Sequence, residues 1–284
     1  MSVIADKILA HINNLPTLPT VYTALSEAMQ NPLVTTDDIA KIISSDQSTA
    51  FKVIKVANSA YYGFSQKVDT ISTAIFYLGF NEVKNLVLAV SIMNMFSKNK
   101  ILVKFKPADF WAHSIAVGVT SRLLAEALGN MNLDNYFLAG VLHDIGKLIF
   151  FEYIPNEYTD VLNFSQESGV EIRDAELKIL GMNHPTIGGL VADKWKIPTY
   201  IKNVIRYHHN PNIVTTNDKT MVGIVHLADI IVKSLSLGYS GDIFVPRPDK
   251  EFLNSIKIPN DLFEKIYNIL IAEYKQSTSM LLGN

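Results

Sequence analysis

Apolar residues recur at three- and four-residue intervals along nearly the whole chain, the spacing that places them on one face of an α-helix. No alternating run of apolar and polar residues indicates a sheet, and no internal repeat is visible. The pattern therefore predicts an all-α protein. The predicted helices cover residues 39–43, 48–63, 69–79, 81–96, 108–128, 133–151, 171–181, 184–194, 198–209, 217–237 and 259–281.

Capping and breaking residues set the ends of several of these helices. Thr36, followed by two aspartates, predicts an N-cap with acidic residues in the first turn. Ser48 is predicted to cap the next helix, and Phe51 to lie on its apolar face. Gly79 is predicted to break the helical pattern that begins near Asp69.

Two stretches are predicted boundaries because they are polar or contain prolines, namely 98–107 and 241–248. We therefore expect an N-terminal helical subdomain over 1–103, a helical core over 104–240, and a C-terminal loop and helix over 241–284.

Composition narrows the possible functions. The chain has 284 residues, of which 48% are hydrophobic and 18% charged, so it can bury a substantial core. The formal net charge of −2 provides no global basic field for nucleic acid. There is no cysteine, which excludes disulfides, thiolate metal ligands and a cysteine nucleophile. The apolar run 86–93 is too short to cross a bilayer and the first residues are charged, so we expect a cytoplasmic protein without membrane association.

The dipeptide His143-Asp144 carries the strongest chemical signal. It follows an apolar run and precedes Gly146-Lys147. Imidazole and carboxylate are both good ligands for Zn, Fe or Mn. Neighbouring side chains on a continuous helix point about 100° apart, so both face one site only where the site wraps around a helix end.

Further histidines and an aspartate lie within apolar helical patterns, where a buried polar group needs a partner or a metal. They are His113, His184, His208, His209, His226 and Asp229. We expect most of them to converge on one site. His208 and His209 are adjacent and are not expected both to face inward, and His226 is expected to pair with Asp229 three residues later.

The order of His113, His143-Asp144 and Asp229 resembles the HD superfamily of metal-dependent phosphohydrolases, and His184 with His208-His209 resembles the extra histidines of its two-metal branch. The match is closest to the HDOD (HD-related output domain) family over residues 13–235. The motifs that carry it are Leu15-Pro-Thr-Leu-Pro, Val56-Ala-Asn-Ser-Ala-Tyr-Tyr-Gly, Ala74-Ile-Phe-Tyr-Leu-Gly, Trp195-Lys-Ile-Pro and Ile205-Arg-Tyr-His-His. The resemblance implies an HD-like helical core, joined to an N-terminal helical bundle, in a bacterial signalling module.

The same resemblance implies a set of site residues for one or two divalent ions, Fe, Mn or Zn. The first ion would take His113, His143, Asp144 and Asp229. A second would share Asp144 and add His184 with His208 or His209. Asp144 and Lys147 are the candidate catalytic residues. Asp144 would be shared by the two ions, and Lys147 resembles the lysine that meets substrate phosphate in the HD-GYP phosphodiesterases. The alternative is a lysine at a helix end that favours the helix dipole.

One departure from the HD-GYP pattern bears on activity. Those enzymes follow their paired histidines with an acidic residue and an Asp-Gly-x-Gly-Tyr-Pro run, whereas this chain continues Asn210-Pro-Asn-Ile-Val-Thr-Thr. We therefore expect a regulatory output module that binds metal without efficient catalysis, has a signalling protein as partner and takes a nucleotide as a candidate ligand. The alternative is an active phosphohydrolase acting on a nucleotide or cyclic dinucleotide.

DNA binding is a third interpretation. Residues 36–60 could form a helix-turn-helix with Lys52 and Lys55 on its second helix. Because the same region carries three aspartates, we do not expect DNA to be the partner.

Overall fold

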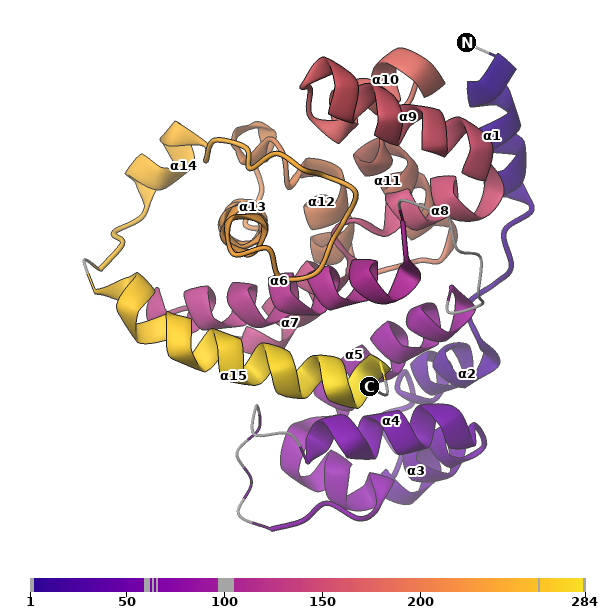
Figure 1. Cartoon of the computed structure of the whole chain (residues 1–284). Coiled ribbons are helices and arrows are strands. Elements are labelled where there is room, and N and C mark those ends of the chain that lie inside the picture. The colour runs from indigo at the N-terminus through magenta and orange to yellow at the C-terminus, as the bar shows by residue number, and fades with distance from the viewer. Residues whose placement is uncertain are drawn as a thin grey trace. The chain divides into compact units, whose positions relative to one another are not determined.

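The computed structural model describes residues 3–58, 62, 64, 66–96, 105–259 and 261–282. Within these ranges the chain forms helices and no β-strand (Figure 1), which confirms the predicted all-α class. It divides into two compact units, one made of residues 1–16 and 99–270, the other of 17–98 and 271–284. Most of the predicted boundary at 98–107 lies outside the described residues, and the predicted division at 103 and 240 stays a prediction.

The first unit holds every candidate site residue. Its helices are α1 (Val3–Asn13), α6 (Pro107–Ala127), α7 (Leu133–Leu142), α8 (Ile145–Tyr153), α9 (Pro155–Ser168), α10 (Ile172–Leu180), α11 (His184–Lys194), α12 (Thr199–Tyr207), α13 (Lys219–Ser234) and α14 (Lys250–Ser255), with a short 3-10 turn η1 (Pro211–Ile213). Helix α15 (Leu262–Leu282) begins in this unit and ends in the other. The predicted single helix over 133–151 is wrong, because α7 and α8 are separate helices, and α9 was not predicted.

The second unit contains α2 (Thr20–Ala28), α3 (Thr36–Ser44), α4 (Gln47–Ala57) and α5 (Ile71–Met95). The predicted caps are each misplaced by one or two residues. Thr35, not Thr36, caps α3 through a reciprocal capping box with Asp38, and Asp46, not Ser48, caps α4. Part of the predicted end of α4, near residue 63, lies outside the described residues.

Two further predictions in this unit have different outcomes. Gly79 interrupts α5 as a kink, with a positive φ of 82° that glycine adopts without steric cost, so the predicted break is present. Phe51 is 66% exposed, so the prediction that it lies on the buried face of α4 is wrong. The face that α4 buries is instead formed by Thr49, Val53, Val56 and Ala57.

Helix α5 is long and apolar enough by composition to pass a test for a membrane span. More than half of its most apolar window, 56%, is buried inside the protein, which is the pattern of a core helix. Glu82 lies buried within it. The described residues contain one such helix, and it is weak evidence for a membrane.

Close helix contacts in the first unit depend on glycine. A Cβ on Gly140 of α7 would lie 2.7 Å from the Cα of Gly118 on α6, so these two helices touch backbone to backbone. A Cβ on Gly146 of α8 would clash with the carbonyl oxygen of His184, where α11 begins. These contacts place the ends of α7, α8 and α11 within side-chain reach of α6.

Candidate metal centre

His143 and Asp144 lie at the break between α7 and α8. Helix α7 ends at Leu142 and α8 begins at Ile145, so the two residues escape the 100° separation of a continuous helix. His143 Nδ1 lies 2.7 Å from the carbonyl oxygen of Gly140. Because a carbonyl can only accept, Nδ1 carries a proton, and Nε2 faces the carboxylates of Asp144 (3.4 Å) and Asp229 (3.7 Å).

His113 on α6 and Asp229 on α13 complete what we call the first ligand group: His113, His143, Asp144 and Asp229. His113 Nε2 lies 3.1 Å from Asp229 Oδ1. The candidate ligand atoms of His113, His143 and Asp144 all lie within 4.8 Å of one another. All four side chains are buried. The structure therefore brings together the four residues that the HD resemblance assigned to a first ion.

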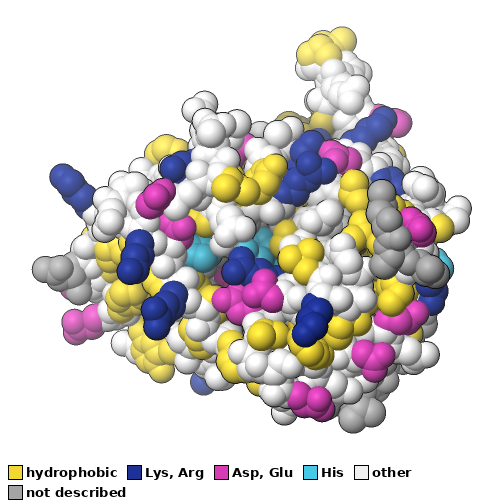
Figure 2. All heavy atoms as spheres, turned by 90° about the horizontal axis from the view of Figure 1, so that it is seen from above, with side chains coloured by type: hydrophobic (Ala, Val, Ile, Leu, Met, Phe, Trp, Pro, Cys, Tyr) yellow, Lys and Arg dark blue, Asp and Glu magenta, His cyan; other side chains and the backbone are white. Residues whose placement is uncertain are grey.

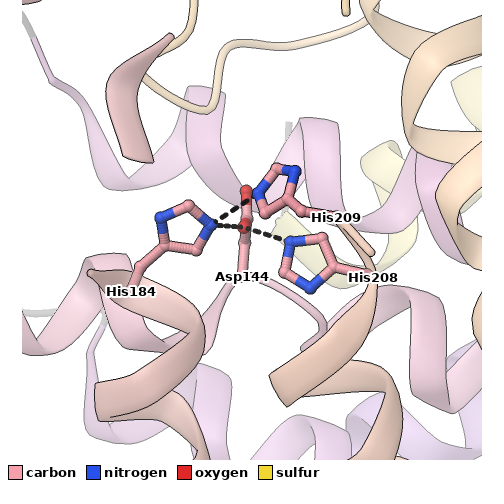
Figure 3. Close-up of side chains that lie close together, drawn as sticks. All are labelled: Asp144, His184, His208 and His209. Atoms are coloured by element: carbon pink, nitrogen blue, oxygen red, sulfur yellow. Dashed lines mark hydrogen bonds and ion pairs between the residues drawn. The ribbon is translucent and has the colours of Figure 1, made fainter. Parts of the chain in front are cut away.

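The second ligand group consists of Asp144, His184, His208 and His209, whose candidate ligand atoms also lie within 4.8 Å of one another. Figure 3 shows the three imidazoles arranged around the Asp144 carboxylate. Asp144 Oδ1 lies 3.1 Å from His184 Nε2 and 3.4 Å from His208 Nε2, and His184 Nε2 lies 2.9 Å from His209 Nε2. Asp144 is common to both groups.

The expectation that His208 and His209 would not both face inward is wrong. Helix α12 ends at Tyr207, and the chain turns at His208 and His209, so neither is bound by the spacing of a helix interior. His208 Nδ1 lies 3.1 Å from the carbonyl oxygens of both Val204 and Ile205, which leaves its Nε2 free to act as a ligand.

A test of metal fit comes from buried atoms that lack partners. His113 Nε2, His143 Nε2, Asp144 Oδ1, His208 Nε2 and Asp229 Oδ1 are all buried, and although they lie as close as 3.1 Å to one another they make no hydrogen bond to any described residue. An unsatisfied buried polar group costs about 1–3 kcal/mol, so five that converge would be a large penalty. They are all nitrogen and oxygen donors of the kind that Zn, Fe and Mn bind. The residues present fit a divalent metal ion.

The pKa values of the buried histidines differ, because nearby carboxylates raise the pKa of His143 while burial lowers those of His208 and His209. Burial opposes protonation of His143, but the carboxylates of Asp144 and Asp229 outweigh it and raise its pKa to about 9. Burial lowers the pKa of His208 to about 4, and burial together with its neighbour His208 lowers the pKa of His209. His208 and His209 are therefore neutral near pH 7, the form in which imidazole binds a metal.

Two buried lysines pair with the carboxylates. Lys147 Nζ donates to Asp144 Oδ2 at 2.6 Å, and Lys233 Nζ lies 2.8 Å from Asp229 Oδ2. Asp242, from the segment after α13, lies 3.1 Å from Lys233 Nζ and 3.8 Å from Lys147 Nζ. Burial of Asp144 would raise its pKa, but Lys147 and the adjacent histidines hold it well below the ordinary value.

The dipole interpretation of Lys147 is wrong. Lys147 lies in the first turn of α8, where the helix dipole disfavours a cation, and its side chain is fully buried against Asp144. Its interaction is with the candidate metal ligand rather than with a helix end.

Sequence reasoning missed Glu176 and misjudged His226. Glu176 Oε2 accepts from the backbone N–H of His184 at 2.8 Å and lies 2.7 Å from its Nδ1, which orients Nε2 toward Asp144. His226 Nδ1 donates to the carbonyl oxygen of His208 at 2.7 Å, and its Nε2 accepts from the backbone N–H of Asp249 at 3.0 Å. The predicted pairing of His226 with Asp229 is replaced by these backbone contacts.

The centre is not sealed from the surface. Figure 2 shows histidine side chains within a hollow on one face, beside lysine or arginine and aspartate or glutamate side chains. His209 is only partly buried, unlike the other members of its group. His209 is therefore the member of the second ligand group that solvent reaches most readily.

Comparison with known protein sequences gives a family and distant relatives. The sequence model of the HDOD domain matches residues 15–211. An uncharacterised protein of Treponema pallidum is 26% identical over 234 residues, which is 82% of this chain and 45% of that protein. Bacillus subtilis YuxH is 33% identical over 60 residues, 21% of this chain and 15% of its own length. The chain spans less than half the length of these curated relatives.

Solved structures share the fold. An HDOD domain protein of unknown function from Geobacter sulfurreducens superposes with a TM-score of 0.80 at 24% identity, covering 98% of this chain and 97% of its own. A protein of Shewanella amazonensis, provisionally assigned as a phosphohydrolase, superposes with a TM-score of 0.75 at 23% identity, covering 97% and 98%. At these identities the likeness establishes the helical fold alone.

Proposed function

Because the chain belongs to the HDOD family, we propose that it is a regulatory output module of bacterial signal transduction that binds one divalent metal ion and lacks efficient catalysis. The observation that carries the proposal is the position of Lys147. Its ammonium lies 2.6 Å from Asp144 Oδ2, the oxygen that faces the first ligand group. A carboxylate that bridged two ions would place a second cation against this ammonium, so bridging competes with the buried ion pair.

The second ligand group is the better metal site. It offers Asp144 Oδ1, which is not paired with a lysine, and three imidazoles, two of which have lowered pKa values. In the first group both carboxylates are already paired with ammonium groups, Asp144 with Lys147 and Asp229 with Lys233. We therefore infer that the resident ion is held by Asp144, His184, His208 and His209.

Charge balance supports a single ion. Four carboxylates, two ammonium groups and the protonated His143 are buried in and around the centre, leaving one negative charge, which a single divalent cation already outweighs. The carboxylates belong to Asp144, Glu176, Asp229 and Asp242, and the ammonium groups to Lys147 and Lys233. Two divalent cations would leave three positive charges in this largely buried cluster.

A bound Fe, Mn or Zn ion would neutralise the carboxylates and act as a Lewis acid toward an oxyanion. The in-line hydrolysis of two-metal phosphohydrolases uses a pair of ions that stabilise both the attacking and the leaving oxygen. A centre limited to one ion lacks this arrangement, and Asn210 follows the paired histidines in place of an acidic residue. Inefficient catalysis follows from both features.

The experiment is elemental analysis of protein purified without chelator and without a metal-affinity column. We expect one equivalent of metal per chain. His208→Gln should remove it, whereas His113→Gln, the matched change in the first ligand group, should retain it. Loss of metal in the His113 variant, with retention in the His208 variant, would place the ion in the other group and contradict this assignment.

Metal-dependent phosphohydrolysis of a nucleotide or cyclic dinucleotide is the alternative function. The unpartnered Nε2 atoms of His113 and His143 favour it, because they would serve a second ion. The provisional assignment of the Shewanella amazonensis structure as a phosphohydrolase is consistent with it. Two equivalents of metal together with turnover would favour this alternative.

We also propose a cytoplasmic location and a signalling protein as partner. The second unit exposes Phe51 and Phe76, at 66% and 80%, which suits contact with another protein. DNA is a poorer partner for this unit, because both candidate lysines are engaged within it. Lys52 Nζ donates to Asn94 Oδ1 at 2.8 Å, and Lys55 Nζ donates to the carbonyl oxygen of Ser279 at 3.2 Å.

A further inference from the structure

A pocket of about 260 Å³ adjoins the first ligand group. It is lined by His113 of α6, Lys233 near the end of α13 and the segment 236–245 that follows α13. None of the candidate ligands of the second group lines it. The pocket is therefore a separate space beside the proposed ion, and its volume lies just below the usual range for small-molecule sites, about 300–1,000 Å³.

The segment that forms the pocket wall is fastened to the core at three points. Gly238 has a φ of +72° and packs so closely on the backbone of His113 that a Cβ would clash with it. The next residue, Tyr239, donates its backbone N–H to the carbonyl oxygen of Asp109 at 2.9 Å. Asp242 Oδ1 accepts from the backbone N–H of Ile172 at 3.0 Å. A wall held in this way gives a preformed pocket, which lowers the entropic cost of binding.

Two side chains that line the pocket, Ser240 and Lys233, each have a hydrogen-bond donor without a described acceptor. The hydroxyl of Ser240, which is 2% exposed, makes no hydrogen bond to any described residue. Lys233 has three N–H donors, and its described ion-pair partners are Asp229 and Asp242. The Tyr239 hydroxyl is already engaged, because it donates to the carbonyl oxygen of Gly241 at 3.1 Å. The Ser240 hydroxyl and the remaining N–H of Lys233 can both donate to one oxygen acceptor on a ligand.

The surrounding charges limit what that acceptor can be. Asp242 lines the pocket, and Asp229 lies directly behind Lys233, so a doubly charged group would meet two carboxylates against one ammonium. A singly charged oxyanion meets less repulsion. At the mouth, Ile243 and Val245 expose 51% and 50% of their surfaces, and an apolar ligand body would cover them.

From these observations we propose that the pocket binds a small molecule bearing a singly charged oxyanion, a carboxylate or a phosphodiester, on an apolar or planar body. The oxyanion accepts hydrogen bonds from Ser240 and Lys233, and the body covers Ile243 and Val245. This inference extends the proposed function, because it gives the metal-bearing module a ligand through which it can sense a signal. It does not require that the ligand be hydrolysed.

The test measures binding of small-molecule probes to the full chain as purified, by calorimetry and ligand-observed NMR. Three probes separate the chemistries: benzoate as a carboxylate, 3′,5′-cyclic AMP as a phosphodiester, and 5′-AMP as a largely dianionic phosphomonoester. We expect benzoate or cyclic AMP to bind more tightly than 5′-AMP, and the tighter of the two identifies the source of the oxyanion. Absence of binding by all three, or preference for 5′-AMP, would overturn the proposal.

Variants separate the pocket from general damage. Ser240→Ala should weaken binding by about tenfold or more, as expected for loss of a hydrogen bond to a charged group. Ser121→Ala is the control, because its hydroxyl on α6 is equally buried and without a described partner but lies outside the pocket. Ile243→Ser changes an exposed residue, so it should weaken binding of the probes without affecting folding. Equal affinity in the Ser240 and Ser121 variants would contradict the proposed hydrogen bond.

Metal content measured on the same samples distinguishes the two proposals. Loss of probe binding in Ser240→Ala with one equivalent of metal retained supports the pocket independently of the ion. If the wild-type protein as purified contains no metal but still binds the probes, the proposed function is contradicted and the proposal for the pocket stands.

Discussion

Replacement of Lys147 by methionine tests the electrostatic argument most directly. Methionine keeps most of the side-chain volume and removes the ammonium that lies 2.6 Å from Asp144 and 3.8 Å from Asp242. Removing one partner of a fully buried ion pair leaves an uncompensated charge and costs about 3–5 kcal/mol. We expect metal-free Lys147→Met to lose this much of its free energy of unfolding.

Added metal should reverse much of that loss. With the ammonium gone, Asp144 Oδ2 becomes available, and we expect metal content to rise from one equivalent toward two. An ion present at a hundred times its dissociation constant stabilises the folded state by about 2.7 kcal/mol. Urea denaturation with chelator and with Mn or Zn, alongside elemental analysis, measures both effects.

Lys202→Met is the matched control, because Lys202 pairs with Asp193 at 2.8 Å on the surface, where the side chains are 27% and 46% exposed. Such a pair contributes about 0–1 kcal/mol. If the Lys147 variant proves no less stable than the Lys202 variant in chelator, or still holds one ion, then Lys147 does not limit the number of ions and our reasoning about the centre fails.

Three other outcomes are expected. Asp144→Ala should abolish bound metal, because Asp144 belongs to both ligand groups, and full occupancy in this variant by elemental analysis would show the site assignment to be wrong. Cyclic-di-GMP should be hydrolysed weakly or not at all with Mn or Fe supplied, since a poorly positioned substrate loses orders of magnitude in rate; robust turnover that disappears in His143→Ala would promote the phosphohydrolase alternative. Gly146→Ala should destabilise the protein by at least about 1–3 kcal/mol and reduce metal content, because its Cβ would press on the carbonyl oxygen of His184; thermal denaturation indistinguishable from wild type would mean that α8 and α11 can separate at no cost.

The helical class could be read from the chain because the apolar period persists through nearly every buried helix. The break between α7 and α8 could not, since apolar residues continue on both sides of His143-Asp144 and no glycine or proline separates them. Helix α9 was missed for the opposite reason. It begins with Pro155 and is mostly polar, so its pattern is typical of a loop.

The candidate ligands were predicted through the order of histidines and aspartates, which the HD resemblance turns into a set. Glu176, Lys233 and Asp242 carry no such signal. Each is a charged residue in a mixed helix or loop, and its position depends on long-range contacts, such as that of Asp242 with Ile172, 70 residues earlier. Helix spacing predicts that His208 and His209 do not both face inward. Because α12 ends at Tyr207, the two histidines do not follow that spacing.

Helix α1 has an unusual consequence for the order in which the chain is made. Its Ala5, Ile8 and Ile12 are buried in the first unit, and the carbonyl oxygens of Ile12 and Asn13 accept from Lys194, 181 residues beyond Asn13. At synthesis rates of about 5–20 residues per second, this partner reaches the growing chain roughly 10–40 s after α1. For most of that interval the apolar face of α1 lacks its native neighbours, because α8, which it also contacts, begins only at Ile145, well after the 17–98 segment has been made. Protection of this nascent segment by a chaperone would therefore matter more to the yield of folded protein than the helix's small size suggests.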